Sequence, residues 1–130
     1  MVLFRSGRSR VQIDTPLQEA LDYVAEDAPA ELMTAIEPLA DGGSPRALET
    51  SGYVVHSLQT ALYDGLLAGS TEKAIVTAVN RDGDTDTIGA IAGAVAGARF
   101  GASQLPDCWL SVIDETDELE RLAEALVEVA

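Results

Sequence analysis

The segment from Asn80 to Gly101 constrains the fold of this chain more than any other stretch. It begins with a run of acids and hydroxyls, Asp82-Gly83-Asp84-Thr85-Asp86-Thr87, and continues into an apolar run of small residues. The glycines of that run recur at every fourth residue, which places them on one face of a helix: Gly89, Gly93, Gly97 and Gly101. An interior glycine costs a helix roughly 1 kcal/mol relative to alanine, so a sequence that repeats it needs the missing side chains. We therefore expect a central, buried helix that another helix approaches closely.

Three alanines should widen this flat strip: Ala90, Ala94 and Ala98. Glycine spacing of this kind also occurs in membrane helices, but the uncharged run from Thr87 to Ala98 is much shorter than the ~20 residues that a span requires. Asp86 and Arg99 close the run at its two ends. The pattern indicates a core helix of a soluble domain and no membrane association.

The rest of the chain predicts further helices and no strand, because no segment alternates polar and apolar residues for long enough. Thr15 and Pro16 are expected to cap and begin a helix that ends near Glu26, and Pro38 is expected to end a second helix that starts at Ala30. The expected helices after these are 51–69, 71–80 capped by Ser70, the central helix, a short turn within 106–112, and a last helix from Thr116.

Several side chains are assigned to the core by this pattern. In the 71–80 helix they are Ile75, Val76 and Val79, and in the last helix they are Leu119, Leu122, Leu126 and Val129. Trp109 is expected to be a core anchor, and Cys108, which has no nearby histidine, is expected to be buried and not nucleophilic. Arg99 is expected to interact with the negative end of its own helix.

Length and composition limit the classes of protein that remain. The chain of 130 residues makes one domain or a piece of one, with residues 1–13 as a basic tail or truncated edge and residues 14–130 as the helical domain. A formal net charge of −14 repels phosphate backbones, so we expect no nucleic-acid partner. Because the acids outnumber the bases and Lys73 is the single lysine, we expect a protein kept soluble in high salt. The N-terminus lacks the apolar run of a secretion signal, which predicts the cytoplasm.

The acidic turn carries the chemistry. An EF-hand calcium loop that starts at Asp82 would need glycine and glutamate where this sequence has Thr87 and Gly93, so that interpretation fails. The alternative is that Asp84, Asp86 and Thr87 point oxygen atoms at one hard divalent cation, Mg²⁺ or Mn²⁺, near the start of the helix. The same residue types also cap helices, and local chemistry alone favours capping.

A resemblance changes that balance. Ser51-Gly52-Tyr53-Val54-Val55, Ala78-Val79-Asn80, and Gly83-Asp84-Thr85-Asp86-Thr87-Ile88 with the alanine/glycine helix resemble the C-terminal part of the ADP-ribosylglycohydrolase family. The resemblance covers roughly residues 45–127 and extends to Leu105-Pro106 and Trp109-Leu110. It implies an orthogonally packed all-α fold, of which this chain would be the C-terminal portion.

The resemblance also implies a two-magnesium hydrolase that cleaves the bond between ADP-ribose and a protein side chain or related acceptor. Its partner would be an ADP-ribosylated protein or a small molecule that contains ADP-ribose. Asp84, Asp86 and Thr87 would be metal ligands, while no residue is assigned as the catalytic acid or base. The residues expected to line the substrate cleft or shape the turn beside it are Ser51, Gly52, Tyr53, Asn80 and Gly83.

Two departures from the family pattern stand out. His56 occupies a position where family members commonly have an acid, and a structural role is expected for it. Family members are also longer and bring further metal ligands from an N-terminal Thr-Asp-Asp-Thr motif and a nearby glutamate, and nothing in residues 1–50 resembles these. Two hypotheses follow: a hydrolase half that needs a second chain, or a non-catalytic helical remnant or interaction module of the same family.

Overall fold

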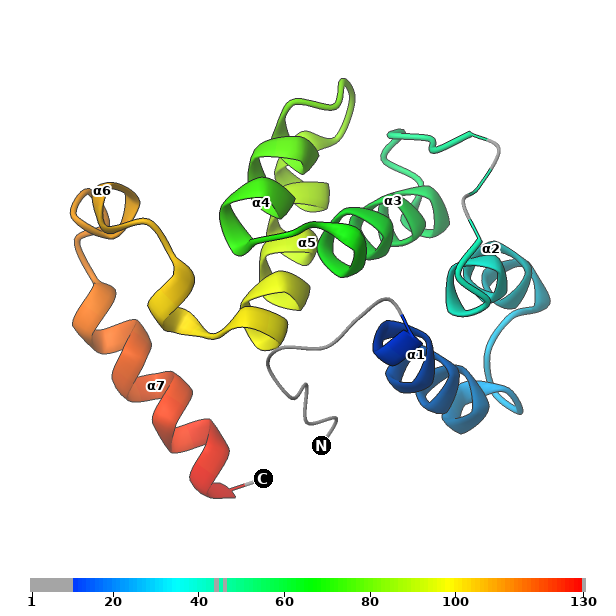
Figure 1. Cartoon of the computed structure of the whole chain (residues 1–130), viewed down its shortest axis with the longest axis horizontal. Coiled ribbons are helices and arrows are strands. Elements are labelled where there is room, and N and C mark those ends of the chain that lie inside the picture. The colour runs from blue at the N-terminus through cyan, green and yellow to red at the C-terminus, as the bar shows by residue number, and fades with distance from the viewer. Residues whose placement is uncertain (1–10, 44, 46, 130) are drawn as a thin grey trace.

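The computed structural model describes residues 11–43, 45 and 47–129, and this part of the chain consists of helices, turns and loops without a strand (Figure 1). The prediction of an all-α fold is confirmed. The α-helices and one short 3-10 helix follow in the order α1 (Val11–Val24), α2 (Ala30–Ala40), α3 (Val54–Leu67), α4 (Thr71–Val79), α5 (Thr85–Phe100), η1 (Ala102–Gln104), α6 (Asp107–Leu110) and α7 (Thr116–Val129). None of the described helices has the length and apolar character needed to cross a membrane.

Helices α3, α4 and α5 pack together at the centre of the molecule (Figure 1). Their shared core is small, and its fully buried members are Ala61, Ala78, Ile88 and Ala92. Ile88 is the largest of these side chains, and it lies in the first turn of α5, directly after the predicted ligand Thr87. The start of α5 is therefore fixed by burial as well as by the turn before it.

The predicted close approach of a second helix to α5 is confirmed, and α4 makes it. A Cβ atom added at Gly89 would lie 2.6 Å from Cγ1 of Val79, and one added at Gly93 would lie 3.3 Å from Cγ1 of Ile75. Gly97 has no neighbour within 4 Å of such a Cβ. Since α4 has nine residues and α5 has sixteen, α4 is too short to reach the last two turns of α5.

Two details of this packing were predicted wrongly. The alanines expected to widen the strip are exposed: Ala90, Ala94 and Ala98. Each follows a glycine by one position and so lies about 100° further around the helix, away from α4. In α4 itself, the buried face is formed by Thr71, Ala74 and Ala78, while Val76 and Val79 remain 41% and 44% exposed.

Helices α1 and α2 form a second cluster against α3. Leu21, Ile36 and Ala40 are its buried members, and Leu58 and Leu62 of α3 pack against them. The expected helix start is wrong, since α1 already includes residue 11 and Thr15 therefore lies inside it. Pro16 removes one backbone hydrogen bond from this helix, and burial of Leu17 and Leu21 in the following turn compensates. The expected basic tail falls mostly on residues 1–10, which lie outside the described part.

The expected stop at Pro38 is also wrong, because α2 continues to Ala40 with the proline in its last turn. Two backbone hydrogen bonds close the chain around that turn, from Asp41 N–H to Glu37 O at 3.2 Å and from Gly43 N–H to Pro38 O at 2.8 Å. The missing N–H of proline is therefore tolerated in the last turn of α2, where these backbone hydrogen bonds close the end of the helix.

The C-terminal elements do not join either core cluster. Helix α7 extends away from the central helices (Figure 1), and its expected core face is exposed: Leu119 55%, Leu122 45%, Leu126 68% and Val129 82%. The amphipathic pattern was identified correctly, but no described helix covers the apolar face. Trp109 is half-buried and Cys108 is exposed, so both expectations of burial are wrong.

Arg99 was expected to interact with the C-terminal end of its own helix, but its hydrogen bond goes to α3. Its Nη1 donates a hydrogen bond of 2.6 Å to Ala68 O, the carbonyl at the C-terminal end of α3, and its guanidinium lies 4.5 Å from the centre of the Phe100 ring. Burial lowers the pKa of Arg99. This contact ties the far end of α5 to α3.

Candidate functional site

The loop between α4 and α5 holds the predicted ligands in a tight backbone turn. Gly83 has φ +92°, and a Cβ atom added there would lie 2.1 Å from Thr50 O. The next residue, Asp84, donates its N–H to the same Thr50 carbonyl at 2.8 Å. The loop before α5 is thus bound to the loop before α3, and only glycine fits at residue 83.

Asp84 and Asp86 lie two residues apart at the start of α5. Asp84 is at the N-cap position, yet its side chain makes no capping hydrogen bond. A hydrogen bond with the Asp84 carboxyl lowers the pKa of the Asp86 carboxyl, and the backbone N–H groups of Thr87 and Asp86 lower it further. Two neighbouring carboxylates repel each other unless a proton or a cation lies between them.

The two acids at the start of α5 have different surroundings. Backbone N–H groups of the first turn help to lower the pKa of Asp86, whereas the Asp84 side chain makes no capping hydrogen bond. Thr87 lies one residue further along the same turn and is exposed. The described residues contain no group of three or more histidines, cysteines or acids placed to hold a metal ion. The predicted set of two carboxylates and one hydroxyl offers only oxygen donors, which suits Mg²⁺ or Mn²⁺.

The segment 51–53, predicted to line the substrate cleft, lies next to these acids. A Cβ atom added at Gly52 would meet Asp84 Oδ2 at 3.7 Å, so the glycine leaves the carboxylate uncovered. Ser51 Oγ accepts the N–H of Tyr53 at 3.3 Å, and the Tyr53 hydroxyl donates to Glu31 Oε2 at 2.8 Å. That hydrogen bond to Glu31 is the main reason why the pKa of Tyr53 is raised. The segment is exposed, and hydrogen bonds with Ser51 and Glu31 hold Tyr53 in place.

The two other predicted residues have structural contacts. Asn80 Nδ2 donates to Val76 O at 2.7 Å and so closes the C-terminal end of α4. Gly83 makes the turn described above. Both shape the loop, which was one of the two roles expected for them.

His56 also takes part in local structure, as expected. Its Nδ1 lies 2.8 Å from Ser51 Oγ and 3.3 Å from Glu49 Oε2, and its ring meets the edge of the Tyr53 ring at a centroid distance of 5.1 Å. Because the serine and the glutamate face the same ring nitrogen, this group does not form the relay of a serine hydrolase, which uses both nitrogens.

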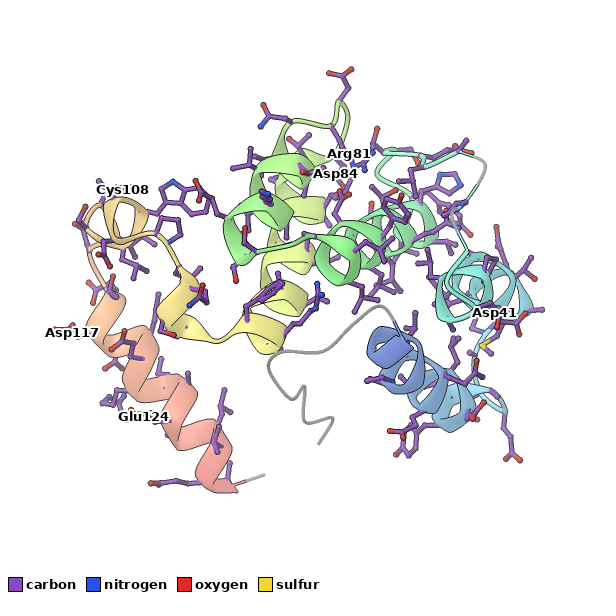
Figure 2. The ribbon with its side chains drawn as sticks, viewed as in Figure 1. Asp41, Arg81, Asp84, Cys108, Asp117 and Glu124 are labelled. Carbon is purple, nitrogen blue, oxygen red and sulfur yellow. The ribbon has the colours of Figure 1, made fainter. Side chains whose placement is uncertain are left out.

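Sequence reasoning missed a line of buried polar side chains on α3. Ser57, Thr60 and Asp64 are 3%, 0% and 4% exposed, and they contact the loops on both sides of the predicted site. Arg81 is their partner from the α4–α5 loop, and its hydrogen bond to Asp64 raises the pKa of Arg81. Figure 2 labels Arg81 and Asp84 close together at the α4–α5 loop. The available signal was the spacing of three and four residues between polar positions in an otherwise apolar helix.

Comparison with known proteins identifies the family of the chain. The family model described as ADP-ribosylglycohydrolase matches residues 3–130. The chain is 37% identical over 84 residues to the ADP-ribosyl-[dinitrogen reductase] glycohydrolase of Rhodospirillum rubrum, a match that covers 63% of this chain and 29% of that protein.

Two further relatives are similar over shorter shares of their length. ADP-ribosylarginine hydrolase Tri1 of Serratia proteamaculans is 32% identical, with 64% of this chain and 23% of that protein covered. Human ADP-ribosylhydrolase ARH3 is 37% identical, with 46% and 16% covered. No solved structure matches the chain. The chain thus spans less than a third of the length of these relatives, while the family model matches it from residue 3 to residue 130. This chain belongs to the ADP-ribosylglycohydrolase family.

Proposed function

We propose that this chain takes part in hydrolysis of the glycosidic bond between ADP-ribose and a protein side chain or related acceptor, at a site that binds Mg²⁺ or Mn²⁺. Asp84, Asp86 and Thr87 are the proposed ligands. The observation that carries this proposal is the position of the Asp84 side chain, which makes no capping hydrogen bond at the start of α5 and lies beside Gly52. The names of the relatives support the substrate class, since two of them are named for ADP-ribosyl-[dinitrogen reductase] and ADP-ribosylarginine.

The residues have separate tasks in this proposal. Asp84 and Asp86 neutralise the cation, and the hydroxyl of Thr87 completes one side of its shell. A bound ion of this kind supplies Lewis acidity and orients the ribose and a water molecule. The segment 51–53 forms the adjoining wall, where Gly52 leaves room beside Asp84 for a substrate group.

Three oxygen donors fill only half of one octahedral shell, and the family resemblance implies two magnesium ions. We infer that the remaining ligands come from a second polypeptide segment, in line with the chain's short share of its relatives' length. The partner of the assembled site is an ADP-ribosylated protein or a small molecule that contains ADP-ribose, and the proposed location is the cytoplasm. The alternative is a non-catalytic helical module that keeps α5 without its chemistry.

Calorimetric titration separates these two functions. We expect Mn²⁺ to bind the chain and ADP-ribose to bind more tightly when Mn²⁺ is present, because the ion and the ribose would share one site. Asp84→Asn should weaken Mn²⁺ binding, since it removes a negative ligand, whereas Asp82→Asn in the same exposed loop should not. Absence of heat with either ligand, in the presence of a native circular dichroism spectrum, would favour the non-catalytic module.

A second prediction concerns salt. With a net charge of −14, mutual repulsion of carboxylates destabilises the folded state at low ionic strength, and salt screens that repulsion over about 10 Å at 0.1 M. We propose that the protein is adapted to high salt, so its melting temperature should rise steadily from millimolar to molar KCl. A helical circular dichroism signal and a melting temperature that are both independent of KCl would contradict this adaptation.

A further inference from the structure

Helix α3 carries a line of buried polar side chains that faces the predicted site. Ser57 Oγ donates to Ser51 O at 3.0 Å, and Thr60 Oγ1 donates to Glu49 O at 2.7 Å. Each hydroxyl therefore holds a backbone carbonyl of the loop before α3. Thr50, which accepts the N–H of Asp84, lies between these two carbonyls.

The third member of the line reaches the other loop directly. Asp64 lies one helical turn after Thr60 on α3, and its side chain is 2% exposed. Arg81 donates to it through two parallel hydrogen bonds, from Nε to Oδ2 at 2.6 Å and from Nη2 to Oδ1 at 2.7 Å. A paired fork of this kind fixes the direction of the loop as well as its distance from α3.

Two attachments thus fix the turn that places the carboxyl groups. One runs from Asp64 to Arg81, three residues before Asp84, and the other runs from Thr50 to the N–H of Asp84 itself. Between them stands Gly83, whose positive φ reverses the chain. The Asp64 carboxylate would be buried without this ionic partner if Arg81 were lost.

We propose that Arg81 and Asp64 are positioning residues that hold the Asp84 and Asp86 carboxyl groups in the arrangement that binds the cation. The part that concerns metal affinity rests on the proposed function, and the part that concerns loop geometry does not. Neither residue contacts the ion in this proposal. Both act through the backbone of the turn, and the specific geometry of the guanidinium fork is what they contribute, since lysine would keep the charge and lose the paired hydrogen bonds.

The test compares two arginines with matched roles in the full chain. Arg81→Lys changes the proposed positioning pair. Arg99→Lys is the control, because Arg99 has similar burial and donates to Ala68 O at the other end of α5. Mn²⁺ affinity is measured by electron paramagnetic resonance, hydrogen exchange of the Asp84 amide by NMR, and stability by thermal unfolding. A third variant, Asp64→Asn, keeps a hydrogen-bond acceptor for Arg81 and removes the charge.

We expect Arg81→Lys to weaken Mn²⁺ binding by about tenfold, the usual loss when a residue that orients metal ligands is changed. The Asp84 amide should also exchange faster in Arg81→Lys. Arg99→Lys should lower stability without changing Mn²⁺ affinity or Asp84 exchange. Asp64→Asn should change Mn²⁺ affinity and Asp84 exchange by less than Arg81→Lys does. Equal Mn²⁺ affinity and equal Asp84 exchange in Arg81→Lys and wild type would overturn the inference. If wild type binds no Mn²⁺, the proposed metal site fails, and the Asp84 exchange rate alone then decides whether the pair positions the loop.

Discussion

Gly83→Ala is expected to lower the free energy of unfolding by about 3 kcal/mol and to displace the start of α5. The residue has φ +92°, a conformation that costs an L-residue roughly 1–2 kcal/mol. The added Cβ would lie 2.1 Å from the Thr50 carbonyl oxygen, a backbone atom that cannot rotate away. Relief of that overlap requires the two loops to separate, at a further cost of about 1–3 kcal/mol.

Urea unfolding followed by circular dichroism measures the first effect. The matched control is Gly69→Ala, because Gly69 has no atom within 4 Å of an added Cβ and a φ outside the positive range. The Asp84 N–H, which donates to the same Thr50 carbonyl, reports the displacement through its exchange rate. If the two variants unfold at the same urea concentration, the loops are not held together at Gly83 as described.

The sequence contained enough information to predict the centre of this fold. Ser70 as the cap of α4 is confirmed by its Oγ, which accepts the Lys73 N–H at 3.1 Å. The close contact at Gly89 and Gly93 is confirmed as well. Both features depend on neighbours within about twenty residues, so local spacing was sufficient to reveal them.

Errors occur where a pattern identifies an apolar face but not what covers it. Leu119 and Leu126 have the spacing of a core helix and are exposed, because burial depends on a second surface that spacing does not encode. Proline rules also failed, because Pro16 and Pro38 lie inside helices α1 and α2. A proline near a helix end costs one hydrogen bond, and the packing of α1 with α2 offsets that cost.

The candidate site was predicted in part. Asp84 and Asp86 both lie at the start of α5 and Gly52 lies beside Asp84, whereas the role of the two acids as ligands stays a prediction. The Arg81–Asp64 pair was missed, since the two residues are 17 positions apart and nothing in their local sequence links them. Only the packing of α3 against the α4–α5 loop brings them together.

The packing of α3 on α5 leads to the second large expected effect. Gly65 is a point of close approach between these helices: an added Cβ would lie 2.9 Å from Val95 Cβ and 3.0 Å from Ala92 O. Gly65→Val should therefore lower the free energy of unfolding by about 3 kcal/mol, because a branched side chain enlarges this overlap and the backbone oxygen of α5 cannot yield. The start of α5 carries the candidate ligands, so a shifted α5 should also change their geometry.

Gly97→Val is the matched control for this substitution, and it should change stability by less than about 1 kcal/mol. Both glycines are helical, so the intrinsic difference between glycine and valine is similar and small at the two positions. Gly97, however, has no atom within 4 Å of an added Cβ, although it belongs to the regular glycine series that Gly65 does not share. Packing thus predicts a large loss of stability for Gly65→Val and almost none for Gly97→Val. Urea unfolding that shows the opposite order would mean that α3 and α5 do not cross at Gly65.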